Sequence, residues 1–301
     1  MNFNEELKQR VEQINALLAA KLPAEEGMQQ RVAEAMNYSV NAGGKRLRPM
    51  LLLEVYRLLG GNDEKIMEPF MAALECIHTY SLVHDDLPAM DNDDYRRGKL
   101  TTHKKFGEDF GVLAGDGLLN YAYELLFNGI SEVTEPDDLI GCVKAAKVIA
   151  YKAGIYGMVG ADCGQSRDVW LTDKPMNEAQ LEFIFNLKTG ALIEAAFMAG
   201  AILAGADDRT VEKMEKAGNL IGVAFQIQDD ILDVTSTQEV LGKPVLSDEK
   251  NHKTTYVTLY GMEKAEKDVV EMSNEALRLI EETGENEFLD ELVRRLIHRE
   301  K

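Results

Sequence analysis

Apolar residues recur with helical spacing through most of the chain, and this pattern restricts the fold more than any other feature of the sequence. The periodic segments are rich in Ala, Leu, Glu, Lys and Met, and they contain few of the alternating β-branched runs that mark strands. Breaks are rare, because the whole chain holds only seven prolines. The pattern predicts an all-α protein with about ten or more helices. The clearest helical segments are residues 49–59, 65–87, 112–127, 177–203, 208–234 and 262–282.

Capping and turn signals separate these helices. Asn177 with Gln180 has the form of a capping box, and either Asp207 or Asp208 can cap the next helix. The Gly-Gly-Asn-Asp segment at 60–63 marks a clear break, and a Gly-Ala-Asp-Asp segment marks another.

The chain lacks the features that would divide it into domains. No Pro/Ser-rich linker, low-complexity tract or fixed-period repeat is present, so residues 1–301 are expected to form a single domain. The segments 177–203 and 208–234 are apolar over more than one face. They are therefore expected to form the central layer of a large helical bundle.

Charge and hydropathy exclude several classes of protein. The formal net charge of -19 disfavours nucleic acid as a partner, because a phosphate backbone would be repelled. An anionic substrate would need metal ions or a local concentration of Lys and Arg. The sequence has no 18-residue apolar run free of charges and no secretory leader, so we expect no membrane span and a cytoplasmic location. Its three cysteines lack CxxC spacing and are expected to be reduced.

A first cluster of aspartates follows the apolar segment 65–87. It contains Asp85, Asp86 and Asp91 and is followed by Arg96 and Arg97. Pro88 removes a backbone donor and disfavours helix at the residue before it, so the helix should break just after the paired aspartates. In an unbroken helix Asp85 and Asp91 would point about 120° apart, whereas a break lets Asp91 fold back. A solvated acidic turn is the alternative.

A second cluster lies within the apolar segment 208–234. Asp229 and Asp233 are four residues apart and share a helix face, and Gln226 and Asp230 are related in the same way. Stacked carboxylates on an apolar helix repel one another, so a cation is the simplest compensation. Carboxylates without nearby His or Cys favour Mg²⁺, which typically takes one or two protein carboxylates plus substrate phosphates.

Basic residues near these clusters could bind phosphate groups. Residues 43–49, Gly-Gly-Lys-Arg-Leu-Arg-Pro, put three cations in a turn before a helix N-terminus, which is a suitable cradle for an anion. Arg96 and Arg97 can bind phosphate oxygens through bidentate forks. His78 lies about two helical turns, roughly 10 Å, before Asp85, where it could be a core histidine or a donor to a second diphosphate. Further basic residues are Lys188, Lys243 and Lys253.

These motifs, taken in order, resemble those of the trans-prenyl diphosphate synthases. The matching residues are 43–49, the first aspartate motif with Arg96-Arg97-Gly98, Lys188-Thr189, and the second aspartate motif with Lys243. The resemblance is closest to bacterial farnesyl diphosphate synthases. It implies the isoprenoid synthase fold, in which helices surround a deep central cavity, and usually a homodimer with three Mg²⁺ ions.

The resemblance also implies roles for single residues. Asp85 and Asp91, supported by Asp86, would bind two ions on one wall, and Asp229, helped by Asp230 and Asp233, would bind the third on the facing wall. Residues expected to hold the allylic diphosphate are Arg96, Lys188, Thr189, Gln226, Lys243 and Lys253. Residues expected to hold isopentenyl diphosphate are Lys45, Arg48, His78 and Arg97. Gln165 and Asp168 resemble the Gln-x-x-Asp pattern of the family, which would support the residues that touch the substrate.

The implied reaction is condensation of isopentenyl diphosphate with dimethylallyl and geranyl diphosphate to farnesyl diphosphate. Tyr80 and Ser81 match family positions that line the cavity floor, and a bulky Tyr80 indicates a C15 product. A core tyrosine is the alternative. Other functions left open are geranyl or geranylgeranyl diphosphate synthesis and a non-catalytic regulatory subunit. Terpene cyclisation uses a similar first motif but ordinarily lacks the region of Lys45 and Arg48.

Overall fold

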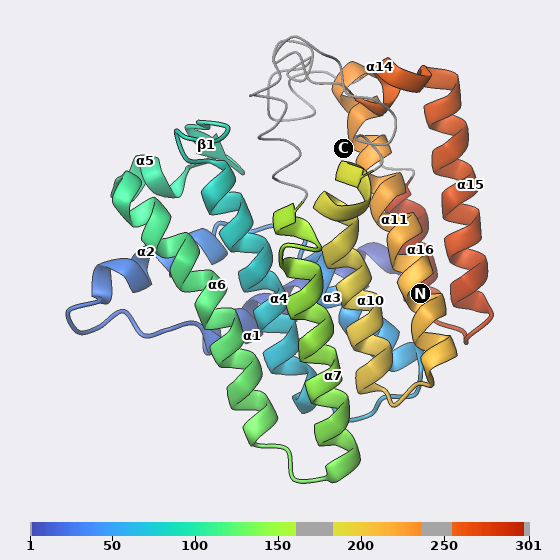
Figure 1. Cartoon of the computed structure of the whole chain (residues 1–301), viewed down its shortest axis with the longest axis horizontal. Coiled ribbons are helices and arrows are strands. Elements are labelled where there is room, and N and C mark those ends of the chain that lie inside the picture. The colour runs from blue at the N-terminus through green and yellow to red at the C-terminus, as the bar shows by residue number, and fades with distance from the viewer. Residues whose placement is uncertain (1, 161–182, 236–254, 298–301) are drawn as a thin grey trace. The chain divides into compact units, whose positions relative to one another are not determined.

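The computed structural model describes residues 2–160, 183–235 and 255–297. Helices make up most of this described part, and one two-stranded sheet is present in it (Figure 1). The expected all-α fold is therefore confirmed. The chain forms two compact units, the first from Met1–Leu53 and Asn62–Ala146 and the second from Glu54–Gly61 and Lys147–Lys301.

The first unit is organised around one long apolar helix, α4. Its elements are α1 (Phe3–Lys21), α2 (Gln30–Val40), the first part of α3 (Leu47–Leu58), α4 (Glu64–Asp85), β1 (Tyr95–Arg96), β2 (Lys99–Leu100), α5 (Thr102–Phe106), α6 (Glu108–Ser131) and the first part of α7 (Pro136–Ala153). Asp63 caps α4 by accepting a hydrogen bond from the amide of Lys65 at 3.1 Å. The helix buries Phe70, Leu74 and Ile77 completely and packs along α6. This packing fixes the direction in which the first aspartate motif leaves α4.

The second unit has α11 at its centre. Its elements are the remaining parts of α3 and α7, a π-helical turn η1 (Asn186–Gly190), α10 (Ala191–Leu203), α11 (Asp208–Thr235), α14 (Tyr256–Tyr260), α15 (Met262–Glu281) and α16 (Glu287–Ile297). α11 packs against both α10 and α15 (Figure 1). Nearly every residue of α10 is buried, as expected for a helix that is apolar on all sides. Asp207 caps α11, since its Oδ1 accepts a hydrogen bond from the amide of Thr210 at 2.8 Å.

Two glycines let α11 lie very close to the preceding helical segment. A Cβ atom on Gly222 would lie 2.5 Å from Cα of Gly190, and one on Gly218 would lie 2.9 Å from Cα of Glu194. No side chain larger than hydrogen fits at either place. The second aspartate motif, which follows Gly222 on α11, is thus held at a fixed position relative to η1.

Candidate active site

The first aspartate motif begins where α4 ends. The helix stops at Asp85, as Pro88 predicts, and the backbone amide of Asp91 donates a 2.8 Å hydrogen bond to the carbonyl oxygen of Asp85. Asn92 then adopts the left-handed conformation, with φ of 54°, and its amide bonds to the carbonyl of Leu87. The expected return of Asp91 towards Asp85 is confirmed for the backbone.

A short β-hairpin follows and carries two arginines. β1 and β2 are joined by Arg97 and Gly98, whose φ angles of 53° and 74° suit a type I′ turn. The hairpin is tied to α2, because Tyr38 Oη donates to the carbonyl of Leu100 at 2.7 Å and Lys99 Nζ donates to the carbonyl of Asn41 at 3.2 Å. The hairpin therefore places Arg96 at the end of β1 and Arg97 in the turn itself.

Arg96 forms a bidentate ion pair with Asp86. Its Nη2 lies 2.6 Å from Oδ1, and its Nε lies 2.8 and 2.9 Å from the two carboxylate oxygens. Burial raises the pKa of Asp86, while the hydrogen bonds and charge of Arg96 oppose this shift. The pair holds the hairpin onto the end of α4. Within the described part of the chain, this pair uses Nε and Nη2 of Arg96.

Positive charge is concentrated around His78, which is half-buried on α4. Burial lowers its pKa well below the usual range, and four nearby guanidinium groups act in the same direction, those of Arg48, Arg97, Arg96 and Arg46. His78 is therefore neutral at physiological pH and can both donate and accept a hydrogen bond. Burial also lowers the pKa of Arg48 to about 10, which still leaves it charged. Its buried Nε has no hydrogen-bond partner among the described residues.

Arg46 does not have the role expected for it, which is to bind an anion together with Lys45 and Arg48. Its guanidinium donates to Glu75 Oε1 at 2.7 Å, to Asn15 Oδ1 at 2.8 Å and to the carbonyl oxygen of Val40 at 2.7 Å. The Arg46 and Glu75 side chains are each only 2% exposed. The interpretation of Arg46 as one of three cations open to an anion is wrong, because the protein itself neutralises it. Lys45 is exposed and Arg48 is half-buried.

The two residues expected at the cavity floor differ in environment. Tyr80 is 5% exposed, and its ring packs edge-on against His84 with centroids 5.8 Å apart. Ser81 is half-buried, and its hydroxyl donates to the carbonyl of His78 at 3.0 Å. Both are compatible with the expected role, which stays a prediction.

The second aspartate motif lies in the last turns of α11, as predicted. Asp229 is exposed, whereas Asp230 and Asp233 are each 4% exposed. Oδ2 of Asp230 accepts a 2.7 Å hydrogen bond from the amide of Tyr256, the first residue of α14, and Gln226 Nε2 lies 3.4 Å from Oδ1. Asp230 therefore anchors α14, and Asp229 is the member of the motif that is open to solvent.

Lys188 and Thr189 lie in the π-helical turn η1. Such turns insert an extra residue into a helix and are frequent at functional sites. The side chains of both residues lie outside the described part of the structure, as do Lys243, Lys253, Gln165, Asp168, Cys163 and the capping box of Asn177 and Gln180.

The carboxylates suit a hard divalent cation. In the first unit Asp85 and Asp91 offer carboxylate oxygens, and in the second unit exposed Asp229 offers another carboxylate. Within the described residues, no group of three His, Cys, Asp or Glu side chains could hold a metal ion by itself. Carboxylates are the protein ligands that Mg²⁺ usually takes, one or two at a time, with water and substrate phosphates completing its coordination.

Three buried glutamates are not predicted from the sequence. They are Glu54, Glu75 and Glu194, and the last pairs with Lys152 and accepts from Asn219 Nδ2 at 2.6 Å. Each is a carboxylate in an apolar helix, a pattern that signals a buried partner, although it does not identify that partner.

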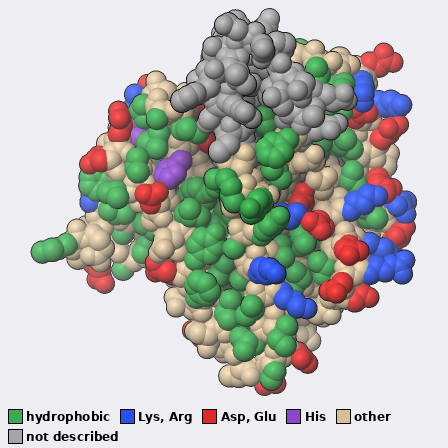
Figure 2. All heavy atoms as spheres, in the orientation of Figure 1, with side chains coloured by type: hydrophobic (Ala, Val, Ile, Leu, Met, Phe, Trp, Pro, Cys, Tyr) green, Lys and Arg blue, Asp and Glu red, His purple; other side chains and the backbone are tan. Residues whose placement is uncertain are grey.

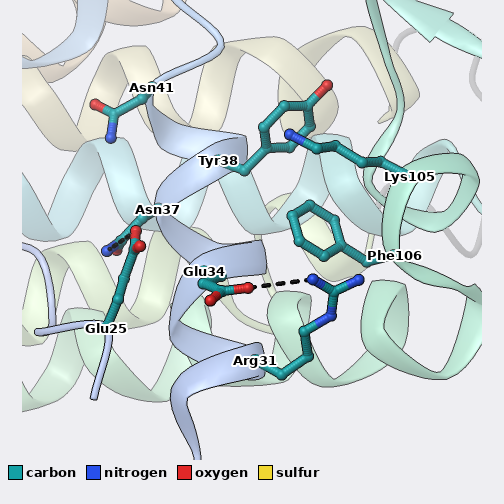
Figure 3. A pocket seen from close by; sticks show the side chains of 8 residues that line it. All are labelled: Glu25, Arg31, Glu34, Asn37, Tyr38, Asn41, Lys105 and Phe106. Atoms are coloured by element: carbon teal, nitrogen blue, oxygen red, sulfur yellow. Dashed lines mark hydrogen bonds and ion pairs between the residues drawn. The ribbon is translucent and has the colours of Figure 1, made fainter.

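A surface pocket of about 360 Å³ in the first unit is separate from the predicted motifs (Figure 3). Arg31 lies over the ring of Phe106, at 4.6 Å from its centroid, and Lys105 lies 3.6 Å from that of Tyr38. Arg31 also pairs with Glu34 at 3.2 Å. The charged groups of this pocket are largely satisfied by each other, and none of its lining residues belongs to an aspartate motif.

Comparison with known proteins gives consistent results. The polyprenyl synthetase family model matches residues 29–296. The chain is 45% identical to farnesyl diphosphate synthase of Geobacillus stearothermophilus over 77% of its length and 76% of the relative's. It is 47% identical to a chloroplastic geranylgeranyl pyrophosphate synthase of Capsicum annuum, over 83% of its length and 66% of the relative's.

Two solved structures cover nearly the whole chain. An FPP/GFPP synthase from Zymomonas mobilis has a TM-score of 0.85 and 33% identity, covering 98% of this chain and 99% of the other. A geranyltransferase from Helicobacter pylori complexed with magnesium and isoprenyl diphosphate has a TM-score of 0.81 and 31% identity, covering 99% and 97%.

The fold, the ordered motifs and these matches define a class of enzyme, the prenyltransferases that use diphosphate substrates. The chain belongs to the polyprenyl synthetase family. No helix in the described residues is long and apolar enough to cross a membrane.

Proposed function

We propose that the protein is a magnesium-dependent farnesyl diphosphate synthase. It would join isopentenyl diphosphate head-to-tail first to dimethylallyl diphosphate and then to geranyl diphosphate. The observation that carries this proposal is that Arg48 and Arg97 lie near His78, on the same helix that ends in Asp85, in a chain whose net charge is -19. The other two nearby guanidinium groups, those of Arg46 and Arg96, are paired with carboxylates. Such a local reversal of charge is suited to a diphosphate.

Each motif has a role in this proposal. Asp85 and Asp91 would hold two Mg²⁺ ions, with Asp86 orienting Arg96, and Asp229 would hold a third. Bound magnesium would supply positive charge to the departing diphosphate. The isopentenyl diphosphate would be held by Lys45, Arg48, His78 and Arg97. The allylic diphosphate would be held by Arg96, Lys188, Thr189, Gln226, Lys243 and Lys253.

The reaction follows from the charges of these groups. Arginine and lysine donors stabilise the negative charge that develops on the allylic diphosphate as its C–O bond breaks. The double bond of isopentenyl diphosphate attacks the resulting allylic cation and forms the new C–C bond. The proton then lost from the adjacent carbon goes to the released diphosphate, so no separate protein base is required. Apolar walls exclude water, which would otherwise trap the cation as an alcohol.

The product length in this proposal is C15, and Tyr80 would limit it. The ring of Tyr80 is buried and fixed against His84, which makes it a suitable barrier to a longer chain. The similarity to a geranylgeranyl pyrophosphate synthase supports a C20 product as the second candidate.

We also propose a homodimer of single-domain subunits. Hydrophobic side chains gather on the face that carries α7 (Figure 2), where Leu139, Ile140 and Val143 are 37–54% exposed. An apolar face of this kind is suited to a second copy of the chain. The expected cytoplasmic location stays a prediction.

The test is incubation of purified protein with labelled isopentenyl diphosphate, dimethylallyl diphosphate and Mg²⁺, followed by dephosphorylation and separation of products by chain length. A C15 alcohol supports the proposal, and a C20 alcohol retains the chemistry while removing Tyr80 from its role. Absence of elongation with both C5 and C10 primers contradicts the enzymatic proposal and favours a regulatory subunit.

A further inference from the structure

The inference concerns Glu75, a buried carboxylate on α4 that belongs to none of the predicted motifs. It lies three residues before His78, so the two side chains share one face of the helix. Its side chain is 2% exposed and pairs with Arg46 at 2.7 Å. A carboxylate buried this deeply would be unfavourable without such a partner.

Arg46 ties the turn before α3 to three other segments. Its three hydrogen bonds go to Asn15 on α1, to the carbonyl of Val40 at the end of α2, and to Glu75 on α4. Arg46 itself has a left-handed backbone, with φ of 48°. A non-glycine residue in this conformation persists only when its surroundings hold it. The contacts of Arg46 therefore determine the path of the turn.

Two cations expected to hold isopentenyl diphosphate lie next to Arg46, Lys45 in the same turn and Arg48 in the first turn of α3. Both are within two residues of Arg46, so displacement of Arg46 would displace them as well. Arg97 also depends on this turn, because its Nη1 donates to the carbonyl of Gly43. The negative charge of Glu75 raises the pKa of both Arg48 and Arg97 and opposes the effect of burial.

We propose that Glu75 is a positioning residue for isopentenyl diphosphate. Through Arg46 it holds the segment of residues 43–48 against the face of α4 that carries His78. It thereby fixes the position of the groups that would donate hydrogen bonds to isopentenyl diphosphate. This inference rests on the proposed prenyl transfer. It assigns to Glu75 an effect on the isopentenyl substrate and not on ionisation of the allylic substrate.

The test compares three variants by steady-state kinetics with saturating geranyl diphosphate. Arg46→Met combined with Glu75→Leu removes both charges and leaves neither buried alone. Glu75→Asp keeps the charge and shortens the side chain by one methylene group, which is a smaller change than the double substitution. Glu54→Gln is the control, because Glu54 is an equally buried carboxylate, 2% exposed, that pairs with Arg57 at 2.9 Å in the second unit.

We expect the KM for isopentenyl diphosphate to rise about tenfold or more in the double variant and by a smaller factor in Glu75→Asp, because misplaced binding groups lose much of their effect. The KM for geranyl diphosphate should stay within about twofold of the wild-type value. The rate at which geranyl diphosphate is hydrolysed in the absence of isopentenyl diphosphate should stay within the same range. Glu54→Gln should lower the melting temperature without raising the KM for isopentenyl diphosphate relative to that for geranyl diphosphate.

The inference is overturned if Glu75→Asp keeps the wild-type KM for isopentenyl diphosphate and the double variant, where it folds, keeps it too. It is also overturned if the KM values for isopentenyl diphosphate and geranyl diphosphate rise by the same factor. Failure of the proposed function looks different, because the wild-type protein would then form no elongated product at all.

Discussion

Asp229 and Asp230 are neighbours in sequence with different environments. Asp229 is exposed, whereas Asp230 is buried and accepts the amide of Tyr256. We expect Asp229→Asn to raise the Mg²⁺ concentration needed for half-maximal activity about tenfold or more, because a carboxylate ligand is lost. The same substitution at Asp230 keeps an acceptor for Tyr256 and should leave the Mg²⁺ requirement nearly unchanged.

Asp230→Ala removes that acceptor and leaves a buried amide unpaired, which should cost about 1–3 kcal/mol in the free energy of unfolding. Activity measured across a Mg²⁺ titration, together with urea denaturation, separates the two roles. A large rise in the Mg²⁺ requirement of Asp230→Asn would show that Asp230 is a ligand.

His78 makes stability depend on pH in a defined direction. Its pKa is lowered by burial and by nearby arginines, so the unfolded chain binds a proton more readily than the native protein does. Stability contributed by neutral His78 is present above pH about 6.5 and is lost as the pH falls below it, by up to about 1.4 kcal/mol per pH unit. Urea denaturation at pH 7.5, 6.5 and 5.5 measures the free energy of unfolding. This free energy should fall less steeply with decreasing pH for His78→Gln than for wild type. Identical slopes would contradict this assignment.

At the residue scale, the charged residues of the motifs can be predicted from the sequence better than the buried ion pairs can. Asp85, Asp91 and Asp229 were recognisable because acidic residues at these spacings are unusual beside apolar helices. The roles of Arg46 and Glu75 were not, because they are 29 residues apart and their pairing depends on how α4 packs against the turn. Spacing along one helix carries no information about such a contact.

Among the elements, the close approach of α11 to η1 is the most sensitive to substitution. Replacing glycine by alanine within a helix normally stabilises it by up to about 1 kcal/mol. At Gly222 we expect the opposite sign, a loss of about 1–3 kcal/mol, because the new Cβ would lie 2.5 Å from Cα of Gly190. Thermal unfolding checks the sign. Unchanged or increased stability in Gly222→Ala would mean that the two segments are not held this closely.

Long helices were predictable and short irregular elements were not. The segment expected at 208–234 is α11 at Asp208–Thr235, and the segment expected at 65–87 is α4 at Glu64–Asp85. Their apolar periodicity extends over many turns, so the predicted helix boundaries lie close to those in the structure. The hairpin at Tyr95–Leu100 and the π-helical turn η1 are too short for periodicity to detect, and both depend on packing.

For the whole molecule, association through the apolar face of α7 can be tested directly. Ile140 is 54% exposed there, and Ile140→Glu should place a charge in a contact between subunits. We expect the wild-type protein to sediment with twice the mass of one chain and the variant to dissociate at micromolar concentration. Gln9→Glu, at an exposed position on α1, is the control for one added negative charge. A monomeric wild type would contradict the proposed dimer.

The central claim is that carboxylates and guanidinium groups of this chain couple release of diphosphate to C–C bond formation. The most direct test is the ratio of inorganic diphosphate released to isopentenyl units incorporated, measured with geranyl diphosphate across a Mg²⁺ titration. We expect one diphosphate for each isopentenyl unit incorporated and neither product after chelation of divalent ions. Release of diphosphate without incorporation would indicate cyclisation or hydrolysis and would contradict the account.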